Sequence, residues 1–77
     1  MGRYFFDIHD GTVVEDYEGL ELPNDDDAMR EAIKSLPTIA AHQIPAGDDR
    51  QSFTVIVRGA DRRPICTAAL LFCGTRL

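Results

Sequence analysis

A run of aromatic residues that stops at a turn signal constrains the fold of this chain more than any other segment. Residues 4–6 read Tyr-Phe-Phe, and residues 9–12 read His-Asp-Gly-Thr. Aromatic residues favour strands, and Asp-Gly readily adopts the positive φ angles of a type I′ turn. We therefore predict a hairpin with strands at residues 3–8 and 12–17, followed by an irregular connection over residues 18–23. The side chains that we assign to its core face are Tyr4, Phe6 and Ile8.

The middle of the chain carries one apolar stripe at helical spacing. Its members are Ala28, Met29, Ala32, Ile33, Leu36, Ile39, Ala40 and Ile44. Asn24 or Asp25 can cap this helix, and Asp26 stands four residues before Arg30, the spacing of a helical ion pair. Pro37 removes a backbone hydrogen bond, at a cost of ~3 kcal/mol or more in a straight helix. Because the stripe keeps its phase across Pro37, we predict one kinked helix rather than two.

Two further alternating segments, residues 51–58 and 64–73, form a second predicted hairpin. The four strands and the helix predict a single α+β domain over residues 1–77, in the order ββ-α-ββ, with the helix on one face of a mostly antiparallel four-stranded sheet. A right-handed crossover through the helix makes the second and third strands run in the same direction. We expect the sheet order 2-1-4-3, because the first and fourth strands are apolar on both faces and suit the centre.

The charge of the chain excludes one class of function. Thirteen Asp and Glu residues against eight Lys and Arg residues give a net charge of −5. A protein that binds the nucleic-acid backbone needs a basic face to displace counterions, so we expect no nucleic-acid partner. No segment reaches the ~18 apolar residues of a membrane span, and none has the features of a signal peptide. We therefore expect a cytoplasmic protein without a membrane partner.

The two cysteines agree with a reducing compartment. Cys66 and Cys73 lie on one predicted strand, which separates them by ~23 Å at 3.3 Å per residue. A disulfide needs Cα atoms within ~7 Å, so the two cannot pair while the strand is intact. We expect two reduced thiols on opposite faces of the strand.

The densest cluster of polar side chains follows the aromatic run. Asp7, His9 and Asp10 are metal-ligand types and are weak candidates for the metal site of a small metal-dependent enzyme. The competing interpretation is a solvated hairpin tip in which Asp7 faces water. A basic cluster in the second hairpin suits either a small anion or acidic peptide, or a solvated loop; its members are Arg58, Arg62 and Arg63. Since the sequence has no Gly-rich phosphate loop or nucleophile elbow, we predict no catalytic residue and no cofactor.

The sheet face opposite the helix suggests a protein partner. One helix covers only one face of the sheet, and four apolar residues fall on the other face: Phe5, Ile56, Ala69 and Leu71. Apolar residues gathered on one face mark an interface. We therefore predict a non-catalytic interaction or regulatory module that forms a homodimer by packing sheet against sheet. The alternative is an acidic antitoxin-like or nucleic-acid-mimicking protein, which requires one acidic stripe on the surface.

Two motifs resemble those of a known family. Residues 1–11 read Met-x-Arg-Tyr-Phe-Phe-Asp-x-His-Asp-Gly, and residues 16–23 read Asp-x-Glu-Gly-x-Glu-Leu-Pro. This pattern resembles a family of short uncharacterised bacterial proteins, frequent in rhizobia and related alphaproteobacteria and described as a domain of unknown function. The resemblance spans nearly the whole chain and departs at Pro37, where the family has a helix former. It implies a bacterial cytoplasmic protein and brings no activity, cofactor or catalytic residue.

Overall fold

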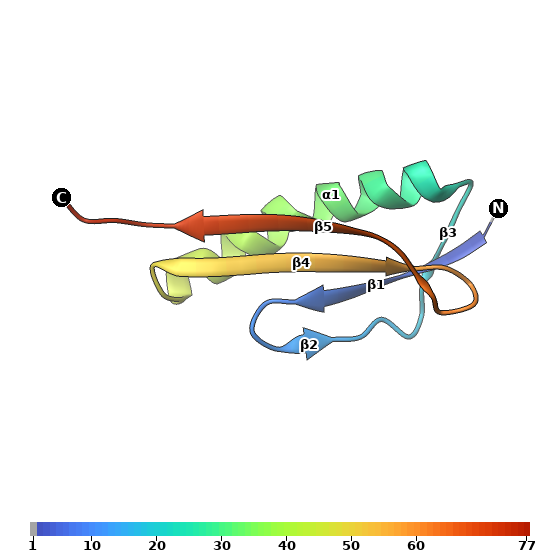
Figure 1. Cartoon of the computed structure of the whole chain (residues 1–77), viewed down its shortest axis with the longest axis horizontal. Helices are drawn as coiled ribbons and strands as arrows, with labels where there is room; N and C mark the ends of the chain where they lie inside the picture. Colours follow the sequence, from blue (N-terminus) through green and yellow to red (C-terminus); the bar gives the residue numbers. More distant parts are fainter. Residues whose placement is uncertain (1) are drawn as a thin grey trace.

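Five strands and one long helix build the structure of residues 2–77, a computed structural model shown in Figure 1. The strands are β1 Gly2–His9, β2 Val13–Val14, β3 Leu20–Leu22, β4 Arg50–Arg58 and β5 Pro64–Cys73. The helix α1 covers Asp25–Gln43 and is followed by the short 3-10 helix η1, Ile44–Ala46. The predicted α+β class, with one helix and an antiparallel sheet, is confirmed.

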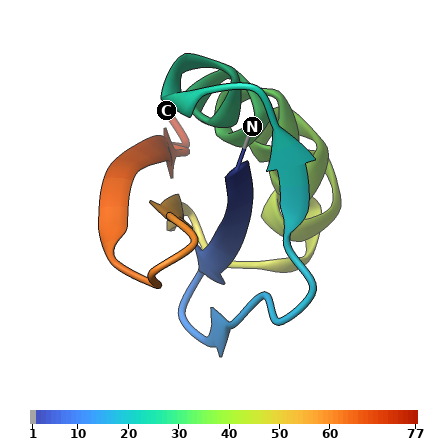
Figure 2. The ribbon, with the colours of Figure 1, turned by 90° about the vertical axis from the view of Figure 1, so that its right-hand side faces the viewer.

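The sheet has the order β2-β1-β4-β5, and all of its pairings are antiparallel. Figure 2 shows β3, which also pairs with β1, on the side of β1 away from β5. The predicted order 2-1-4-3 is wrong, because β4 lies beside β1 and β5 lies at the edge. Phe53, Val55 and Val57 of β4 are at most 1% exposed, so this strand needs neighbours on both sides. The common direction of the second and third predicted strands is confirmed, since β2 and β4 both run antiparallel to β1.

The first hairpin differs from its prediction in both turn and strand length. Gly11 has a φ of +101°, but it is alone among residues 10–12 in having a positive φ, so the turn is not of type I′. The carboxylate of Asp10 instead accepts hydrogen bonds from the backbone N–H and the hydroxyl of Thr12. The predicted second strand shortens to β2, and the predicted irregular connection contains β3. Two short strands therefore share this edge of the sheet.

One helix continues through Pro37, so the prediction of one helix rather than two is confirmed. Asn24 is its N-cap, and its side-chain oxygen accepts a hydrogen bond from the backbone N–H of Asp27 at 2.8 Å. Arg30 pairs with Asp27 at 3.4 Å, so the predicted pair of Arg30 with Asp26 is wrong. Pro37 lies on the exposed side of α1, where water can solvate the carbonyl that loses its N–H partner. Within residues 2–77, no helix combines the length and apolar character needed to cross a bilayer.

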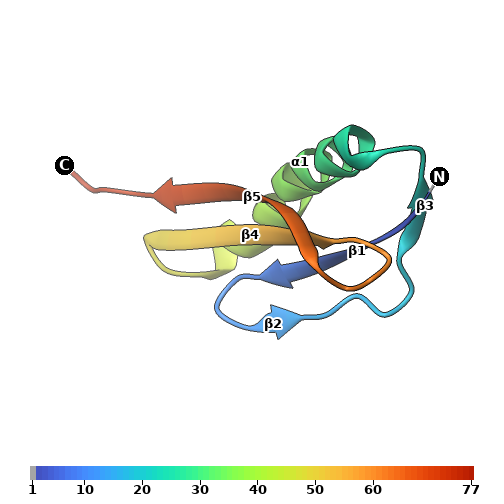
Figure 3. The ribbon, with the colours of Figure 1, turned by 45° about the vertical axis from the view of Figure 1, so that its right-hand side comes forward.

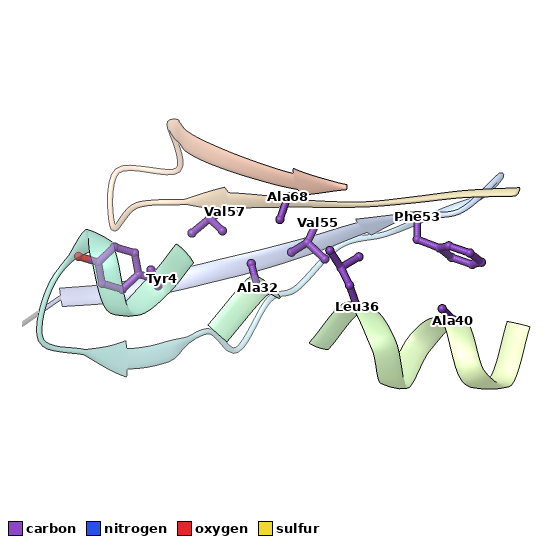
Figure 4. Close-up of a cluster of buried hydrophobic side chains, with 9 residues drawn as sticks. Tyr4, Ala32, Leu36, Ala40, Phe53, Val55, Val57 and Ala68 are labelled. Carbon is purple, nitrogen blue, oxygen red and sulfur yellow. The ribbon is translucent and has the colours of Figure 1, made fainter. Parts of the chain in front are cut away.

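Small side chains on the helix allow it to pack closely on the sheet (Figure 4). The buried residues of α1 are Ala28, Ala32, Leu36 and Ala40. They meet the three buried side chains of β4, each of which contributes ~1.5–3 kcal/mol when it leaves water. Tyr4 closes one end of the core as predicted, and its hydroxyl donates a hydrogen bond to Asp25 at 2.7 Å. Phe6 and Ile8 pack against this core and stay partly exposed.

The β4–β5 pair extends beyond β1 at one end of the sheet. Residues 54–58 of β4 pair with β1, whereas residues 50–53 pair with β5 alone. Figures 1 and 3 show the resulting two-stranded ribbon of β4 and β5 extending past the end of β1. This ribbon contributes to the elongated shape of the molecule, 49 × 20 × 17 Å.

Candidate functional site

Asp7 is the buried centre of the polar cluster that the N-terminal motif supplies. It is 4% exposed, which corrects the interpretation that it faces water. Its Oδ2 accepts a hydrogen bond from Arg58 Nε at 2.5 Å, and its Oδ1 accepts one from the backbone N–H of Asp16 at 3.1 Å. Burial alone raises the pKa of Asp7, but these two hydrogen bonds and the nearby positive charges outweigh it and lower the pKa below 3.8. Asp7 is therefore an ionised anchor that joins β1, β4 and the segment after β2.

Asp16 replaces a strand where the edge of the sheet is interrupted. β2 pairs with Ile8–His9 and β3 with Gly2–Tyr4, which leaves the middle of β1 without a partner strand on this side. Oδ2 of Asp16 accepts the N–H of Phe6 there, and Oδ1 accepts the N–H groups of Glu18 and Gly19. One carboxylate thus satisfies three backbone donors, so its role is structural.

Gly19 brings the same segment close against β1. Its φ is +74°, a conformation that L side chains rarely adopt. A Cβ atom at this position would lie 2.9 Å from the backbone oxygen of Tyr4 and 3.0 Å from the ring of Phe5. Residue 19 must therefore be a glycine if the segment is to cover the outer face of β1.

Phe5 is buried by its own chain, although the sequence placed it on an exposed face. Its exposure is 7%, because Gly19 approaches one side and Arg62 covers the ring, with the guanidinium carbon 4.2 Å from the ring centroid. Arg62 reaches this place from a left-handed backbone conformation with φ +69°. The premise that Phe5 is free to meet a partner is therefore wrong.

The arginines of the second hairpin already have partners within the chain. Arg58 binds Asp7 and also donates a hydrogen bond to the carbonyl of Arg62 at 3.3 Å, while Arg62 stacks on Phe5. Arg63 lies 3.7 Å from the carboxylate of Asp61. These contacts favour the interpretation of a folded, solvated loop over that of an anion site.

The three candidate metal ligands do not converge. Asp7 and His9 share the outer face of β1, but both oxygens of Asp7 are engaged as described above. Asp10 lies in the turn, where its carboxylate binds Thr12. Among residues 2–77, no three His, Cys, Asp or Glu side chains are grouped closely enough to hold a metal ion. The cluster therefore stabilises the first hairpin.

Two open hollows lie near the end of the β4–β5 ribbon. One, of about 340 Å³, is lined by Arg50, Gln51, Ser52, Leu71, Phe72 and Cys73. The other, of about 410 Å³, lies between the first turn and the start of β4 and includes Asp10, Asp48 and Arg50. Their titratable side chains are exposed or half-buried. Neither hollow therefore offers a titratable side chain buried in an apolar pocket, as acid–base chemistry requires.

The outer sheet face next to the ribbon keeps its exposed apolar residues. Leu71 is 78% exposed, Ala69 is exposed and Ile56 is half-buried. The register places Leu71 beside Ser52, and Ala69 beside Thr54. We define the outer patch as six uncharged side chains in three neighbouring pairs of the β4–β5 register on this face: Ser52, Thr54, Ile56, Thr67, Ala69 and Leu71. Three of the four predicted interface residues thus share one surface, and Phe5 is removed from it.

The cysteines lie as predicted, both free and on opposite faces of β5. Cys66 packs against the core, and burial, followed by the negative charge of Asp25, raises the pKa of its thiol. Cys73 is exposed near the end of the ribbon. The raised pKa of the Cys66 thiol is the opposite of what a nucleophilic cysteine requires.

Comparison with known proteins assigns a family but no activity. No curated protein and no solved structure matches this chain at a significant level. The model of one family, described as a domain of unknown function (DUF6894), matches residues 3–71. This match covers nearly all of β1, all of β2 to β4 and most of β5, including every residue of the polar cluster described above. The chain therefore belongs to the DUF6894 family, a domain of unknown function.

Proposed function

We propose that this protein is a non-catalytic interaction module that works as a homodimer, with the outer patch as part of the contact. The observation that carries the proposal is Leu71, which is 78% exposed on the outer patch, beside Ser52 and Ala69. Full burial of a leucine side chain contributes ~1.5–3 kcal/mol, and a symmetric dimer buries two copies of each residue. Ile56 and Ala69 enlarge the same surface.

The role of the polar motif supports a non-catalytic function. Asp7 and Asp16, two acids of the family motif, bind backbone N–H groups and Arg58 with their carboxylate oxygens. An enzyme keeps such groups free to reach a substrate. The motif therefore accounts for stability, and its residues need no further role.

The alternative of an acidic mimic has less support from the charge distribution. Asp25, Asp26 and Asp27 lie at the start of α1, and Asp48 and Asp49 lie beyond its end. A helix of 19 residues spans ~28 Å at 1.5 Å per residue, so the two groups lie far apart along the helix. Ion pairs with Arg and Lys occupy further carboxylates along the chain. This arrangement favours solubility as the role of the acids.

We place this module in the bacterial cytoplasm. Two free thiols are compatible with a reducing compartment, and the resemblance of the N-terminal motifs supports a bacterial origin.

Sedimentation equilibrium over a wide concentration range tests the proposal. The wild-type protein should approach twice the 8.6 kDa mass of the chain, and Leu71→Asp should shift it to the monomer. Because Leu71 is exposed, this variant should melt within a few degrees of wild type. Val14→Asp, which changes a 57% exposed residue on the other edge of the sheet, serves as the matched control and should stay dimeric. A wild-type protein that is monomeric at high micromolar concentration would refute the homodimer.

A further inference from the structure

The backbone of β5 has hydrogen-bonding groups that point away from the sheet. The N–H of Gly74 donates to the carbonyl of Asp49 at 2.6 Å, so these two residues form a hydrogen-bonded pair. Hydrogen-bonded and non-hydrogen-bonded pairs alternate in an antiparallel ladder. The β4–β5 register therefore turns the backbone of Phe72, Leu70 and Ala68 toward β4. The residues between them turn their N–H and C=O groups to the open side: Thr67, Ala69, Leu71 and Cys73.

Beyond a register shift opposite Val57 and Arg58, at the start of β5, this open edge has none of the features that protect edge strands. Within residues 2–77, β5 pairs with β4 alone. Its ten residues include no charged side chain, and its one proline is the first residue, Pro64. Charged side chains, internal prolines and short length are the usual protection against pairing with another chain. In Figure 2 β5 (orange) is the outermost strand on the left, with no element of the described residues on its side away from β4.

The opposite edge of the same sheet is well protected. It consists of β2, with two residues, and β3, with three, and the gap between them is filled by the carboxylate of Asp16. Glu21 in β3 adds a charged side chain to this edge, where it pairs with Arg3 at 3.4 Å. One edge of this sheet is therefore closed to strand addition, whereas the other is long, regular and uncharged.

We infer that β5 pairs antiparallel with β5 of a second copy across a two-fold axis. This inference rests on the proposed homodimer and names the strand that forms it. A second copy is the partner because it supplies an equally long, uncharged strand, and because the net charge of −5 makes an uncharged strand the place where two copies approach at least cost. Since the other edge is closed, the pairing stops at two copies and does not grow into a filament.

The pairing joins the two outer patches into one surface. Ala69 and Leu71 have their side chains on the outer face and their backbone groups at the open edge. In the antiparallel dimer they therefore lie beside their counterparts across the axis. Ile56 lies one strand further in, on β4, so it belongs to the joined surface but lies outside the strand pairing itself.

A proline at position 69 tests the edge directly by sedimentation equilibrium. Ala69→Pro removes one outward N–H, and edge strands tolerate a proline whose N–H side faces solvent. We expect the dissociation constant of its dimer to be at least about tenfold higher than that of wild type. The paired strands lose a hydrogen bond, and the proline ring obstructs the approach of the partner strand. Ala69→Ser, which changes the same side chain but keeps the N–H, should dimerise like wild type. Circular dichroism verifies that each variant is folded.

Two further variants keep the test decisive if Ala69→Pro does not fold. Thr67→Lys places a charge on the open edge at an exposed position and should also weaken the dimer at least about tenfold. Ile56→Thr makes the outer face of the sheet less apolar but leaves the open edge of β5 unchanged. It should therefore weaken a dimer in which two sheets stack face to face and leave a dimer paired through β5 intact. A dimer that survives Ala69→Pro and Thr67→Lys overturns the edge pairing alone. A wild-type monomer overturns the homodimer and with it the pairing, and growth beyond two copies overturns the closed two-fold arrangement.

Discussion

Replacement of Asp7 by alanine should destabilise the fold strongly without touching any surface used for binding. The change removes a carboxylate that is 4% exposed and that accepts hydrogen bonds from Arg58 at 2.5 Å and from the N–H of Asp16 at 3.1 Å. It leaves the guanidinium without its partner and releases the segment that covers Phe5. The loss therefore reaches β1, β4 and the segment between β2 and β3 together.

The size of the effect follows from the burial of the pair. Removal of one member of a buried ion pair costs 3–5 kcal/mol in general. The side chain of Arg58 is 30% exposed and gains some water, so we expect the lower limit, ~3 kcal/mol. In a domain of this size, 1 kcal/mol shifts the melting temperature by ~4–8 °C, which gives a decrease of roughly 12–24 °C. Asp7→Asn keeps the shape and loses the charge, so its cost should be ~1.5 kcal/mol.

Urea and thermal denaturation followed by circular dichroism measure these costs. The same measurements at several pH values separate the contribution of the charge of Asp7 from that of its shape. The pKa of Asp7 is lowered in the folded protein, so the unfolded state takes up the proton first as the pH falls. The advantage of wild type over Asp7→Asn is then complete above the unfolded pKa near 3.8 and decreases as the pH falls through the lower folded pKa. A cost below ~0.5 kcal/mol for Asp7→Ala, or an advantage that does not change with pH, would refute the role of Asp7 as an anchor.

Three further predictions follow from single contacts. Asn24→Ala should cost ~1 kcal/mol in urea denaturation, because α1 loses its side-chain cap, whereas Asn24→Ser should cost little. Gly19→Ala should cost ~2–3 kcal/mol and clearly more than Gly11→Ala, since both have positive φ but only residue 19 meets β1 within 3.0 Å; equal losses would contradict this packing. A thiol reagent followed by mass spectrometry should label Cys73 well before Cys66, whose burial raises the pKa of its thiol, and the reverse order would contradict the orientation of β5.

Local patterns in the sequence predict the helix and the long strands well, but they predict poorly which strands lie next to each other in the sheet. Alternation identified the long strands, and the stripe across Pro37 identified one helix, because both are properties of consecutive residues. The strand order failed at β5, since residues such as Thr67 and Ala69 look the same at the centre of a sheet and at an edge. Strand order depends on which neighbour covers the buried side chains of β4, and that information is not local.

The candidate site illustrates the same limit. Asp7 was predicted to face water because its partner, Arg58, lies 51 residues away in the sequence. Phe5 was predicted to be exposed because its cover comes from Arg62, in the second hairpin. By contrast, Ile56, Ala69 and Leu71 were placed on one face correctly, since alternation within β4 and β5 fixes that face. Asp16 was not identified from the sequence as the acceptor of backbone N–H groups. The feature of the sequence that points to this role is the spacing of an acid three residues before a glycine in the family motif.

Hydrogen exchange of the β5 amides at increasing protein concentration tests the central claim most directly. The amides of Ala68, Leu70 and Phe72 bond to β4 and should be protected at every concentration. The amides of Thr67, Ala69 and Leu71 should exchange quickly in the dilute protein and become protected as the dimer forms. Outward amides that exchange quickly at all concentrations, in a sample that sedimentation reports as dimeric, would contradict pairing through β5.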